Sequence, residues 1–402
     1  MEPDQANSGV MVASGQKPRR KHLHVLTLTP FYPSAGDEVS GCFVAELLQQ
    51  LSSEDITSTV MAVNALHHGR KVADIRNPAE WLRYPQFPGN LGLSSAGILL
   101  YARIRKKAHR LHRQRHIDVI HAHAALPCGH AGALLAKDLG IPFAVSVHGL
   151  DAFNTCFVQG ASVAWRRKAS WEVYRQARTV VCISEKVRHV LTDAMGSEVH
   201  TTVVYNGTDT ECFSPGVTVA RDDATLLIVG NLLRGKGQEL ILQAVAKLKD
   251  EHPFLRCLFV GDGPDRRIFL ESAKQLGIEG QVSFVGRKGR AEVAAAMRRS
   301  TMFVLPSTYE GLGCVYLEAM ASEMPVIACR GQGIDEIIRH QENGWLIGVG
   351  KLDELVQGIS LMLQNPGTRT EMGKAARATI LNGLTLSDQA KCMRSVYDSV
   401  IA

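Results

Sequence analysis

Short apolar runs rich in β-branched residues recur along the chain and alternate with longer segments of helical period. The first series is HLHVLTL (22–28), STVMAV (58–63), DVIHAH (118–123), FAVSVH (143–148), TVVCIS (179–184) and TTVVYN (201–206). The second is TLLIVG (225–230), LRCLFVG (255–261), QVSFVG (281–286), TMFVLP (301–306) and MPVIAC (324–329). Continuous runs without polar alternation are typical of strands buried on both faces of a parallel sheet. Two series therefore predict an α/β protein with two facing, Rossmann-like, doubly wound parallel-sheet domains and an interdomain cleft.

The length of 402 residues is too great for one compact core and suits two domains. The polar stretch 206–224, which contains Gly and Pro, is the best linker candidate. We therefore expect a disordered leader at 1–20, an N-terminal domain at 21–206, a C-terminal domain at 207–385 and a closing helix at 386–402 that returns to the N-terminal domain.

Composition excludes several classes of protein. No apolar run approaches 18 residues, so no membrane-spanning helix is expected. The polar N-terminus lacks the apolar core of a secretory signal. The nine cysteines are scattered, with no C-x-x-C pair, which favours free thiols in a reducing cytoplasm over a disulfide framework or a zinc ribbon.

The net charge of +6 is concentrated in YARIRKKAHRLHRQRH (101–116), which has seven Lys and Arg and no acidic residue. One interpretation is a solvated helix face. The other is a patch for an anionic membrane surface, because apolar residues such as Ile98 and Leu99 flank the basic run. Nucleic acid is not an expected partner, since neither interleaved aromatic residues nor a known reading motif is present.

The segment FVLPSTYEGLGCVYLEAMASEMPVIAC (303–329) carries the strongest chemical signal. A strand leads to Glu310, and Gly311-Leu312-Gly313 then opens a helix at about Cys314. Glycines let a ligand approach the backbone, and unpaired N–H groups at a helix start favour phosphate. Glu318 lies one turn into this apolar helix and needs hydrogen-bond partners. Sugar or ribose hydroxyls would serve, as would a nearby lysine.

A second strand–loop–helix unit, LLIVGNLLRGKGQELILQAV (226–245), places Arg234 and Lys236 before a helix that starts near Gln238. Two cations beside a helix N-terminus suit a diphosphate. An isolated loop lysine is usually only solvated. The repetition of the same unit at two places strengthens the prediction of a phosphate site.

Histidines follow two of the expected strands. SVHGLDAF (146–153) carries His148 and Asp151 at a strand end, where a histidine is structural more often than catalytic. His121 and His123 could suggest a metal pair, but no third ligand follows at metal spacing, so no metal is expected.

The loop PFYPSAGDEVSG (30–41) contains Gly36 and Gly41 between the first strand and the first helix. It lacks G-x-G-x-x-G with an acidic residue further on, which argues against a dinucleotide cofactor.

Together these motifs resemble the retaining, GT-B-fold glycosyltransferases of family 4. Glu310-x₇-Glu318 is similar to the family's E-x₇-E signature, and GNLLRGKG, HGLD, CISEKVRHVL, VVYNGTD and FVGDGP lie where the family has counterparts. The resemblance covers about residues 22–400. PFYPSAGDEVSG and GQGIDEII (331–338) look closest to bacterial exopolysaccharide and teichuronic-acid-type transferases.

The resemblance implies a GT-B architecture whose N-terminal domain binds the acceptor and whose C-terminal domain binds a nucleotide-sugar. Glu310 would bind hydroxyls of the donor sugar, Glu318 the ribose and Lys236 the diphosphate, and His148 would lie beside the transferred sugar. The remaining implied contacts are the Gly36–Gly41 loop over the phosphates, backbone around Val285 and Arg287 at the base, Gly311, Leu312, Gly313 and Cys314 on the donor side, and Asp151 on the acceptor side.

The sequence departs from the family at Asn231, where an arginine is usual. The neutral side chain removes one charge contact to the diphosphate unless Arg234 replaces it. No D-x-D pair ends a strand, which is consistent with a metal-independent site and no cofactor beyond the nucleotide-sugar substrate.

The resemblance implies sugar transfer from a UDP- or GDP-sugar to a glycan or lipid-linked acceptor with retention of configuration, in polysaccharide biosynthesis. Three alternatives remain open: a sugar-nucleotide epimerase on the same fold, a catalytically silent nucleotide-sugar-binding protein, and a nucleotide-dependent oxidoreductase. An epimerase would turn over the nucleotide-sugar without an acceptor. The oxidoreductase is disfavoured because the dinucleotide motif is missing.

Overall fold

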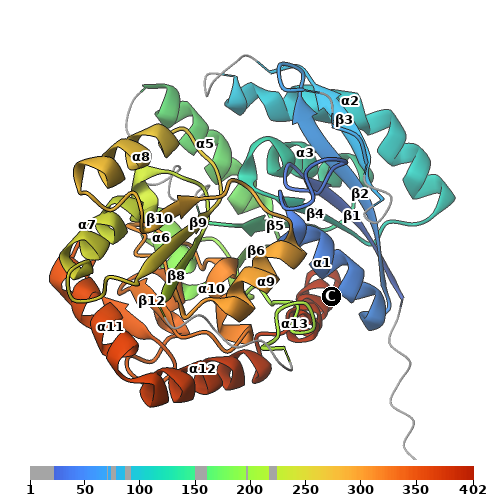
Figure 1. Ribbon diagram of the computed structural model, residues 1–402. Coiled ribbons are helices and arrows are strands. Elements are labelled where there is room, and N and C mark those ends of the chain that lie inside the picture. The colour runs from blue at the N-terminus through green and yellow to red at the C-terminus, as the bar shows by residue number, and fades with distance from the viewer. Residues whose placement is uncertain are drawn as a thin grey trace, which may run out of the picture.

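The chain folds around two parallel β-sheets, shown on the right and left of Figure 1. The computed structural model describes residues 22–69, 71–73, 78–86, 92–149, 161–195, 198–216 and 224–402. The expected leader, 1–20, lies outside them. Every strand pair within both sheets is parallel, so the prediction of a two-sheet, doubly wound α/β fold is confirmed.

The first sheet has seven strands in the order β3-β2-β1-β4-β5-β6-β7. Its strands are β1 (Leu23–Thr29), β2 (Ile56–Ala65), β3 (Glu80–Tyr84), β4 (Val119–His123), β5 (Phe143–Val147), β6 (Thr179–Cys182) and β7 (Thr201–Val203). The helices around it are α1 (Cys42–Leu51), α2 (Leu93–Gln114), α3 (His130–Leu139), α5 (Ala161–Gln176) and α6 (Glu185–Met195). All seven residues of β1 are buried, including His24, Thr27 and Thr29, as expected for a central strand between two helix layers.

The second sheet has six strands in the order β10-β9-β8-β11-β12-β13. Its strands are β8 (Thr225–Val229), β9 (Arg256–Val260), β10 (Val282–Phe284), β11 (Met302–Val304), β12 (Val326–Cys329) and β13 (Trp345–Ile347). The helices that follow in this half are α7 (Gln238–Leu248), α8 (Arg266–Gln275), α9 (Arg290–Arg299), α10 (Cys314–Ala321), α11 (Leu352–Gln364) and α12 (Pro366–Leu381).

Both sheets reverse their winding direction once, between β1 and β4 in the first and between β8 and β11 in the second. At such a switch point the loops after the two neighbouring strands diverge and leave a crevice at the carboxyl edge of the sheet. The loops after β8 and β11 are the ones that carry Lys236 and Glu310. The topology therefore places these two residues on the same crevice.

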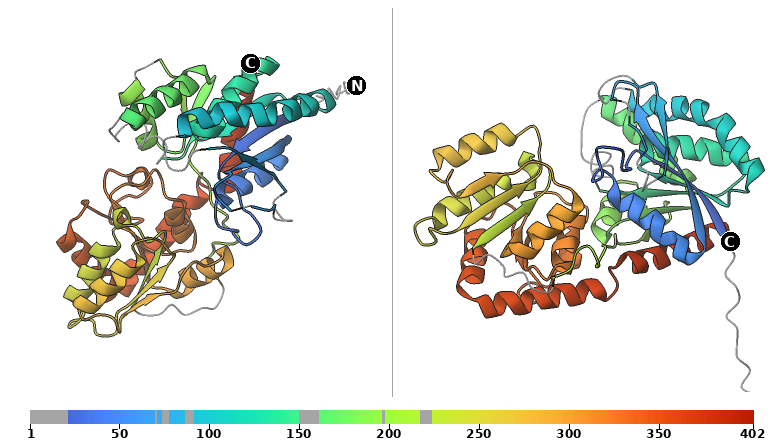
Figure 2. Two further views of the ribbon diagram at one scale, coloured as in Figure 1. Left: turned by 90° about the horizontal axis from the view of Figure 1, so that it is seen from above. Right: turned by 45° about the vertical axis from the view of Figure 1, so that its right-hand side comes forward.

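The last helix, α13 (Leu386–Ile401), leaves the second half and packs on the first. Figure 2 shows this red helix running from α12 to the blue helix α1. Its start is capped reciprocally by Thr385 and Asp388. Met393 and Tyr397 are buried in a cluster with residues of α1 and β1. Helix α13 thus completes the core of the first sheet. The boundaries and roles of the two domains stay predictions.

The two strands that sequence patterns missed are β3 and β13, which lie at sheet edges. Strand β3 (EWLRY) carries two charged residues and is mostly half-buried, while β13 (WLI) has three residues. Neither shows the long apolar run that marks a central strand. Within the described residues, no helix is both long and apolar enough to cross a membrane.

Candidate active site

An ion pair between Lys236 and Glu310 lies at the switch point of the second sheet. The Lys236 Nζ atom donates a hydrogen bond to Glu310 Oε2 at 2.6 Å. Their side chains are 24% and 15% exposed, so both charges remain within reach of a ligand. The residues come from the loops after β8 and β11. A ligand with a diphosphate and sugar hydroxyls could exchange this ion pair for contacts to each partner.

The backbone of Glu310 is held by the turn that follows β12. Its N–H donates to the Gln332 side-chain oxygen at 3.0 Å, and its carbonyl accepts from Gly333 N at 3.0 Å. A Cβ atom on Gly333 would lie 1.7 Å from the Gly311 carbonyl oxygen. The position of Glu310 therefore depends on the absence of a side chain at residue 333.

The glycine loop before α10 contacts the first half of the chain. The Ser184 hydroxyl donates to the Gly311 carbonyl at 2.6 Å. A Cβ atom on Gly149 would come within 3.0 Å of the Gly311 Cα atom. Gly313, with a φ of 80°, is the left-handed residue before the helix. These contacts bring the Glu310 loop against the strand end that carries His148.

Two further residues of this loop are buried or bonded to the opposite half. The Leu312 side chain is fully buried. The Asn206 amide donates to the Cys314 sulfur at 3.2 Å. The burial of Leu312 and the hydrogen bond to Cys314 hold the loop in place.

Glu318 on α10 is paired with an arginine, where the sequence left open ribose hydroxyls or a lysine. Arg290 Nη1 donates to Glu318 Oε1 at 2.9 Å, and Arg290 Nε lies 2.7 Å from Glu46 Oε1 on α1. Burial raises the pKa of Glu318, and the positive charge of Arg290 opposes that shift. Burial likewise raises the pKa of Glu46, to about 7.

A cavity of about 450 Å³ lies beside Arg290, between the two halves of the chain. Cys42 and Glu46 of α1 line one side, and Gly289 and Arg290 at the start of α9 line the other. The space between the halves is therefore large enough for a small molecule.

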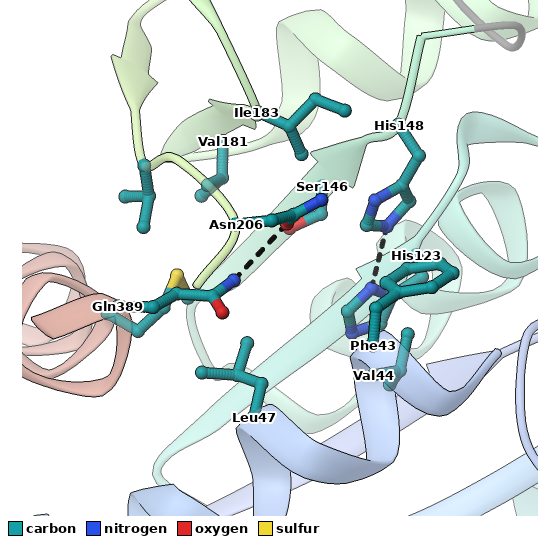
Figure 3. Close-up of a pocket in the computed structure, with 12 residues that line it drawn as sticks. Phe43, Val44, Leu47, His123, Ser146, His148, Val181, Ile183, Asn206 and Gln389 are labelled. Atoms are coloured by element: carbon teal, nitrogen blue, oxygen red, sulfur yellow. Dashed lines mark hydrogen bonds between the residues drawn. The ribbon is translucent and has the colours of Figure 1, made fainter. Parts of the chain in front are cut away.

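His148 lies in an aromatic setting at the end of β5, as Figure 3 shows. Its Nε2 atom is 2.9 Å from His123 Nδ1, and the two rings are parallel within 7°. Phe31 and Phe43 flank the ring, with centroids 5.6 and 5.0 Å away. Burial lowers the pKa of His148 to about 4, so the imidazole is neutral at neutral pH.

The pair His121 and His123 belongs to a buried hydrogen-bond network. The two nitrogens of His121 lie 2.8 Å from the Tyr397 hydroxyl and from the Ser146 hydroxyl. Among the described residues, no group of three or more His, Cys, Asp or Glu could hold a metal. The expectation of a metal-independent site stays a prediction.

The small cavity drawn in Figure 3 adjoins this network and has a volume of only about 10 Å³. That is close to the space of one water molecule. It cannot hold a sugar, so this cavity is not the candidate substrate site.

Two family models match consecutive parts of the chain. Residues 41–212 match the model described as Glycosyltransferase Family 4, and residues 211–379 match Glycosyl transferases group 1. The chain thus combines a glycosyltransferase family 4 domain with a glycosyltransferase group 1 domain. The matches span every strand of both sheets except β1 and include Lys236 and Glu310. With the two parallel sheets and the structural neighbours below, they confirm the expected GT-B fold.

Individual similar proteins support the same assignment. An uncharacterized glycosyltransferase of Methanocaldococcus jannaschii is 29% identical over 294 residues, which span 71% of this chain and 76% of that protein. Sucrose-phosphate synthase from Thermosynechococcus elongatus has the same fold, with a TM-score of 0.78, 20% identity and coverage of 93% of this chain and 98% of that one. Anabaena Alr3699/HepE, in a complex with UDP-glucose, superposes with a TM-score of 0.71 at 19% identity, over 94% of this chain and all of that one.

The first glycine loop of this glycosyltransferase follows β1, at the switch point of the first sheet. Gly41 has a φ of 77°, and a Cβ atom there would lie 2.3 Å from the Phe31 carbonyl carbon, so only glycine fits. Gly36 also has a positive φ but has open space around it. Within this loop, the position that has no room for a side chain is therefore Gly41, directly before α1.

The other predicted donor residues of this glycosyltransferase lie in loops after β8 and β10 and make no hydrogen bond to either side chain of the ion pair among the described residues. Asn231 and Arg234 are exposed after β8, and Val285 and Arg287 are exposed after β10. The Arg234 guanidinium makes no hydrogen bond or ion pair within the described part of the chain. It is thus available to a ligand. Asp151 lies outside the described residues.

Sequence patterns did not single out Arg290, Gln332 or Ser184 as parts of this site. A signal for Arg290 existed, since a cation at the first position of a helix opposes the helix dipole and suggests an acidic partner. The contacts of Gln332 and Ser184 depend on how distant turns meet. Both residues lie in motifs that carried the family resemblance, CISEKVRHVL and GQGIDEII, but neither motif indicated these contacts.

Proposed function

We propose that this glycosyltransferase moves a sugar from a UDP- or GDP-sugar to a glycan or lipid-linked acceptor, with retention of configuration, in polysaccharide biosynthesis. The observation that carries the proposal is the accessible Lys236–Glu310 pair at the switch point of the second sheet. It offers a cation for a diphosphate beside a carboxylate for sugar hydroxyls. The likeness to a protein crystallised with UDP-glucose supports the same donor class.

In this proposal the donor lies along the carboxyl edge of the second sheet. Lys236, with Arg234 in place of the arginine that Asn231 lacks, compensates the charge of the diphosphate. Glu310 accepts hydrogen bonds from the sugar and Glu318 from the ribose. The base meets the backbone between Val285 and Arg287, and the Gly36–Gly41 loop covers the phosphates. No metal is required for these contacts.

The proposed reaction is a front-face displacement. The bond between the anomeric carbon and the β-phosphate oxygen breaks first, and its electron pair leaves with the nucleoside diphosphate. The acceptor hydroxyl attacks the same face, and its proton passes to the departing phosphate oxygen. The chain's contribution is positioning and charge stabilisation, with Lys236 beside the leaving group.

We propose that the first half binds the acceptor and that His148 borders the transferred sugar. At neutral pH its imidazole is uncharged, so it would serve as a hydrogen-bonding and packing surface. The contact between Gly149 and Gly311 brings this strand end to the donor loop. Closure of the two halves would exclude water, whose attack would waste the donor.

Nucleotide binding provides the direct test of the donor class. Melting curves of the wild type are recorded with UDP, GDP, ADP and NAD. A nucleotide at 100 times its dissociation constant adds about 2.7 kcal/mol of stability. We expect stabilisation by UDP or GDP that Glu318→Ala abolishes and that Glu342→Ala, which removes an exposed carboxylate paired with Arg339, retains. No stabilisation by either nucleotide would contradict the proposal.

The product distinguishes transfer from the alternatives. Incubation with the nucleotide-sugar and an acceptor should give a glycoside whose anomeric configuration, read by NMR, equals that of the donor. Conversion of the nucleotide-sugar to a stereoisomer without any acceptor would instead indicate an epimerase. Binding without turnover would indicate a silent binding protein.

We also propose that helix α2 attaches this cytoplasmic enzyme to an anionic membrane surface. Exposed residues recur at helical spacing along one stripe, which we call the basic stripe: Leu99, Arg103, Lys106, Arg110 and Arg113. Its four cations make no ion pair within the described residues, whereas Arg105 pairs with Asp138. Trp165, on the neighbouring helix α5, is 56% exposed and adds an apolar anchor. Unpaired cations with apolar flanks favour an acidic lipid interface.

Vesicle sedimentation tests the membrane proposal. Each cation near an anionic surface contributes about 1 kcal/mol, so replacing the four cations of the basic stripe with Glu should weaken partitioning at least about 10²-fold. The matched control replaces four exposed cations of the second half with Glu, namely Arg267, Lys274, Arg339 and Lys374. Equal binding by both variants, or binding to neutral vesicles that salt does not weaken, would contradict a role for the stripe.

A further inference from the structure

Three separate parts of the chain meet at the guanidinium of Arg290, the first residue of α9. Its Nη1 atom donates to Glu318 on α10 at 2.9 Å, and its Nε atom lies 2.7 Å from Glu46 on α1. Its carbon Cζ is 4.8 Å from the centre of the Phe213 ring, in the segment that joins the two sheets. One side chain of the second half therefore contacts the candidate donor site, the first half and the connecting segment.

Only an arginine can make this set of contacts. Its planar fork presents donors in fixed directions, so Nε and Nη1 can each serve a different carboxylate while the flat face packs on Phe213. A lysine would offer one charged atom. The start of a helix disfavours a cation, and burial of the side chain to 20% exposure adds a desolvation cost. The two carboxylates offset these costs.

The hydrogen bond from Arg290 to Glu318 holds one oxygen of that carboxylate and does not involve the other oxygen. Arg290 occupies Oε1, and Oε2 accepts no hydrogen bond from the described residues. The Glu318 side chain is 13% exposed, so this oxygen stays within reach of a ligand. The positive charge of Arg290 also favours the ionised form of Glu318, the form that accepts hydrogen bonds from hydroxyl groups.

The arm to Glu46 exists only while α1 lies against the start of α9. Arg290 Nη1 also donates to Cys42 Sγ on α1 at 3.4 Å, and residues of the same two elements line the cavity of about 450 Å³. If the halves move apart, Arg290 loses Glu46 but keeps Glu318, because α9 and α10 belong to one half. The ion pair between Arg290 and Glu46 therefore forms only when the two halves are closed, and it involves the same arginine that holds Glu318.

We propose that Arg290 is the positioning residue for Glu318, and that its second arm to Glu46 couples nucleotide binding to closure of the two halves. The proposal rests on the proposed function in one respect, the binding of a ribose by Glu318. Coupling is reciprocal, so a nucleotide that favours closure binds more tightly to the closed form.

Two variants separate the arms, with UDP and GDP as probes. Arg290→Met removes both arms at nearly constant length, and Glu46→Gln removes the charge of the interdomain partner while leaving Arg290 with Glu318. Arg299→Met is the matched control, an exposed arginine at the other end of α9 that forms no ion pair within the described residues. Calorimetry gives the dissociation constant, and small-angle scattering with and without nucleotide gives the separation of the halves.

We expect Arg290→Met to raise the dissociation constant at least tenfold and to give a more extended particle. Glu46→Gln should also be more extended, with a smaller loss of affinity, and Arg299→Met should match the wild type in both. If Arg290→Met binds the nucleotide as the wild type does, the positioning role is wrong. If Glu46→Gln is as compact as the wild type, the coupling is wrong. Failure of the wild type itself to bind would overturn the proposed function, and the positioning role with it.

Discussion

Replacing Lys236 with alanine is expected to lower kcat about 10²–10³-fold, with little change in melting temperature. Lys236 is the cation beside Glu310 at the switch point, and the proposed leaving group carries the negative charge of a diphosphate. Loss of one preorganised electrostatic partner typically costs this much in rate. Both side chains of the pair reach solvent, at 24% and 15% exposure, so water can hydrate Glu310 once the lysine is removed. The measurement is steady-state release of nucleoside diphosphate with acceptor present.

The control for this experiment is Lys247→Ala, on α7 in the same half. Lys247 forms an ion pair with Asp353, but both side chains are far more exposed, at 52% and 91%. Its loss should leave kcat unchanged, since exposed pairs contribute little. Near-normal kcat for Lys236→Ala would rule out a leaving-group role for this residue. A parallel loss in both variants would indicate a general effect of charge on the protein.

The central strands of both sheets could be predicted because they are buried on both faces. Strands such as β1 and β8 have apolar runs that no surface element would carry, and the sheet order then follows from the doubly wound pattern. The edge strands β3 and β13 were not predicted, because each pairs with a neighbouring strand on one side only and its apolar run is short or interrupted by charged residues. Their pairing is decided by the neighbouring strand.

The meeting of Lys236 and Glu310 was implied by the sequence. Each residue follows a strand that ends at the same edge of the sheet, so loop position alone brings them together. Arg290 and Glu46, by contrast, are 244 positions apart and lie on helices of different halves. Local patterns carry no information on how two domains dock. The interdomain part of the site therefore required the structure.

The second large effect is expected for a substitution at Gly333. It tests the position of Glu310 separately from the overall stability of the protein. A Cβ atom at residue 333 would lie 1.7 Å from the Gly311 carbonyl oxygen and 3.1 Å from the Leu312 Cα atom. Gly333→Ala must therefore displace the glycine loop by more than about 1 Å. Misplacement on this scale can cost about 10² in rate. We expect kcat/KM to fall about 10²-fold for the nucleotide-sugar.

The matched variant is Gly331→Ala, two residues earlier in the same turn. Gly331 has a φ of 74° but open space around it, so alanine there brings only the backbone cost of about 1–2 kcal/mol. Overpacking at Gly333 costs about 1–3 kcal/mol, a similar loss of stability. Comparable melting temperatures with a large difference in kcat/KM would therefore show that the loss arises from the displaced Glu310 loop. Equal activity in the two variants would mean that the turn after β12 does not position Glu310.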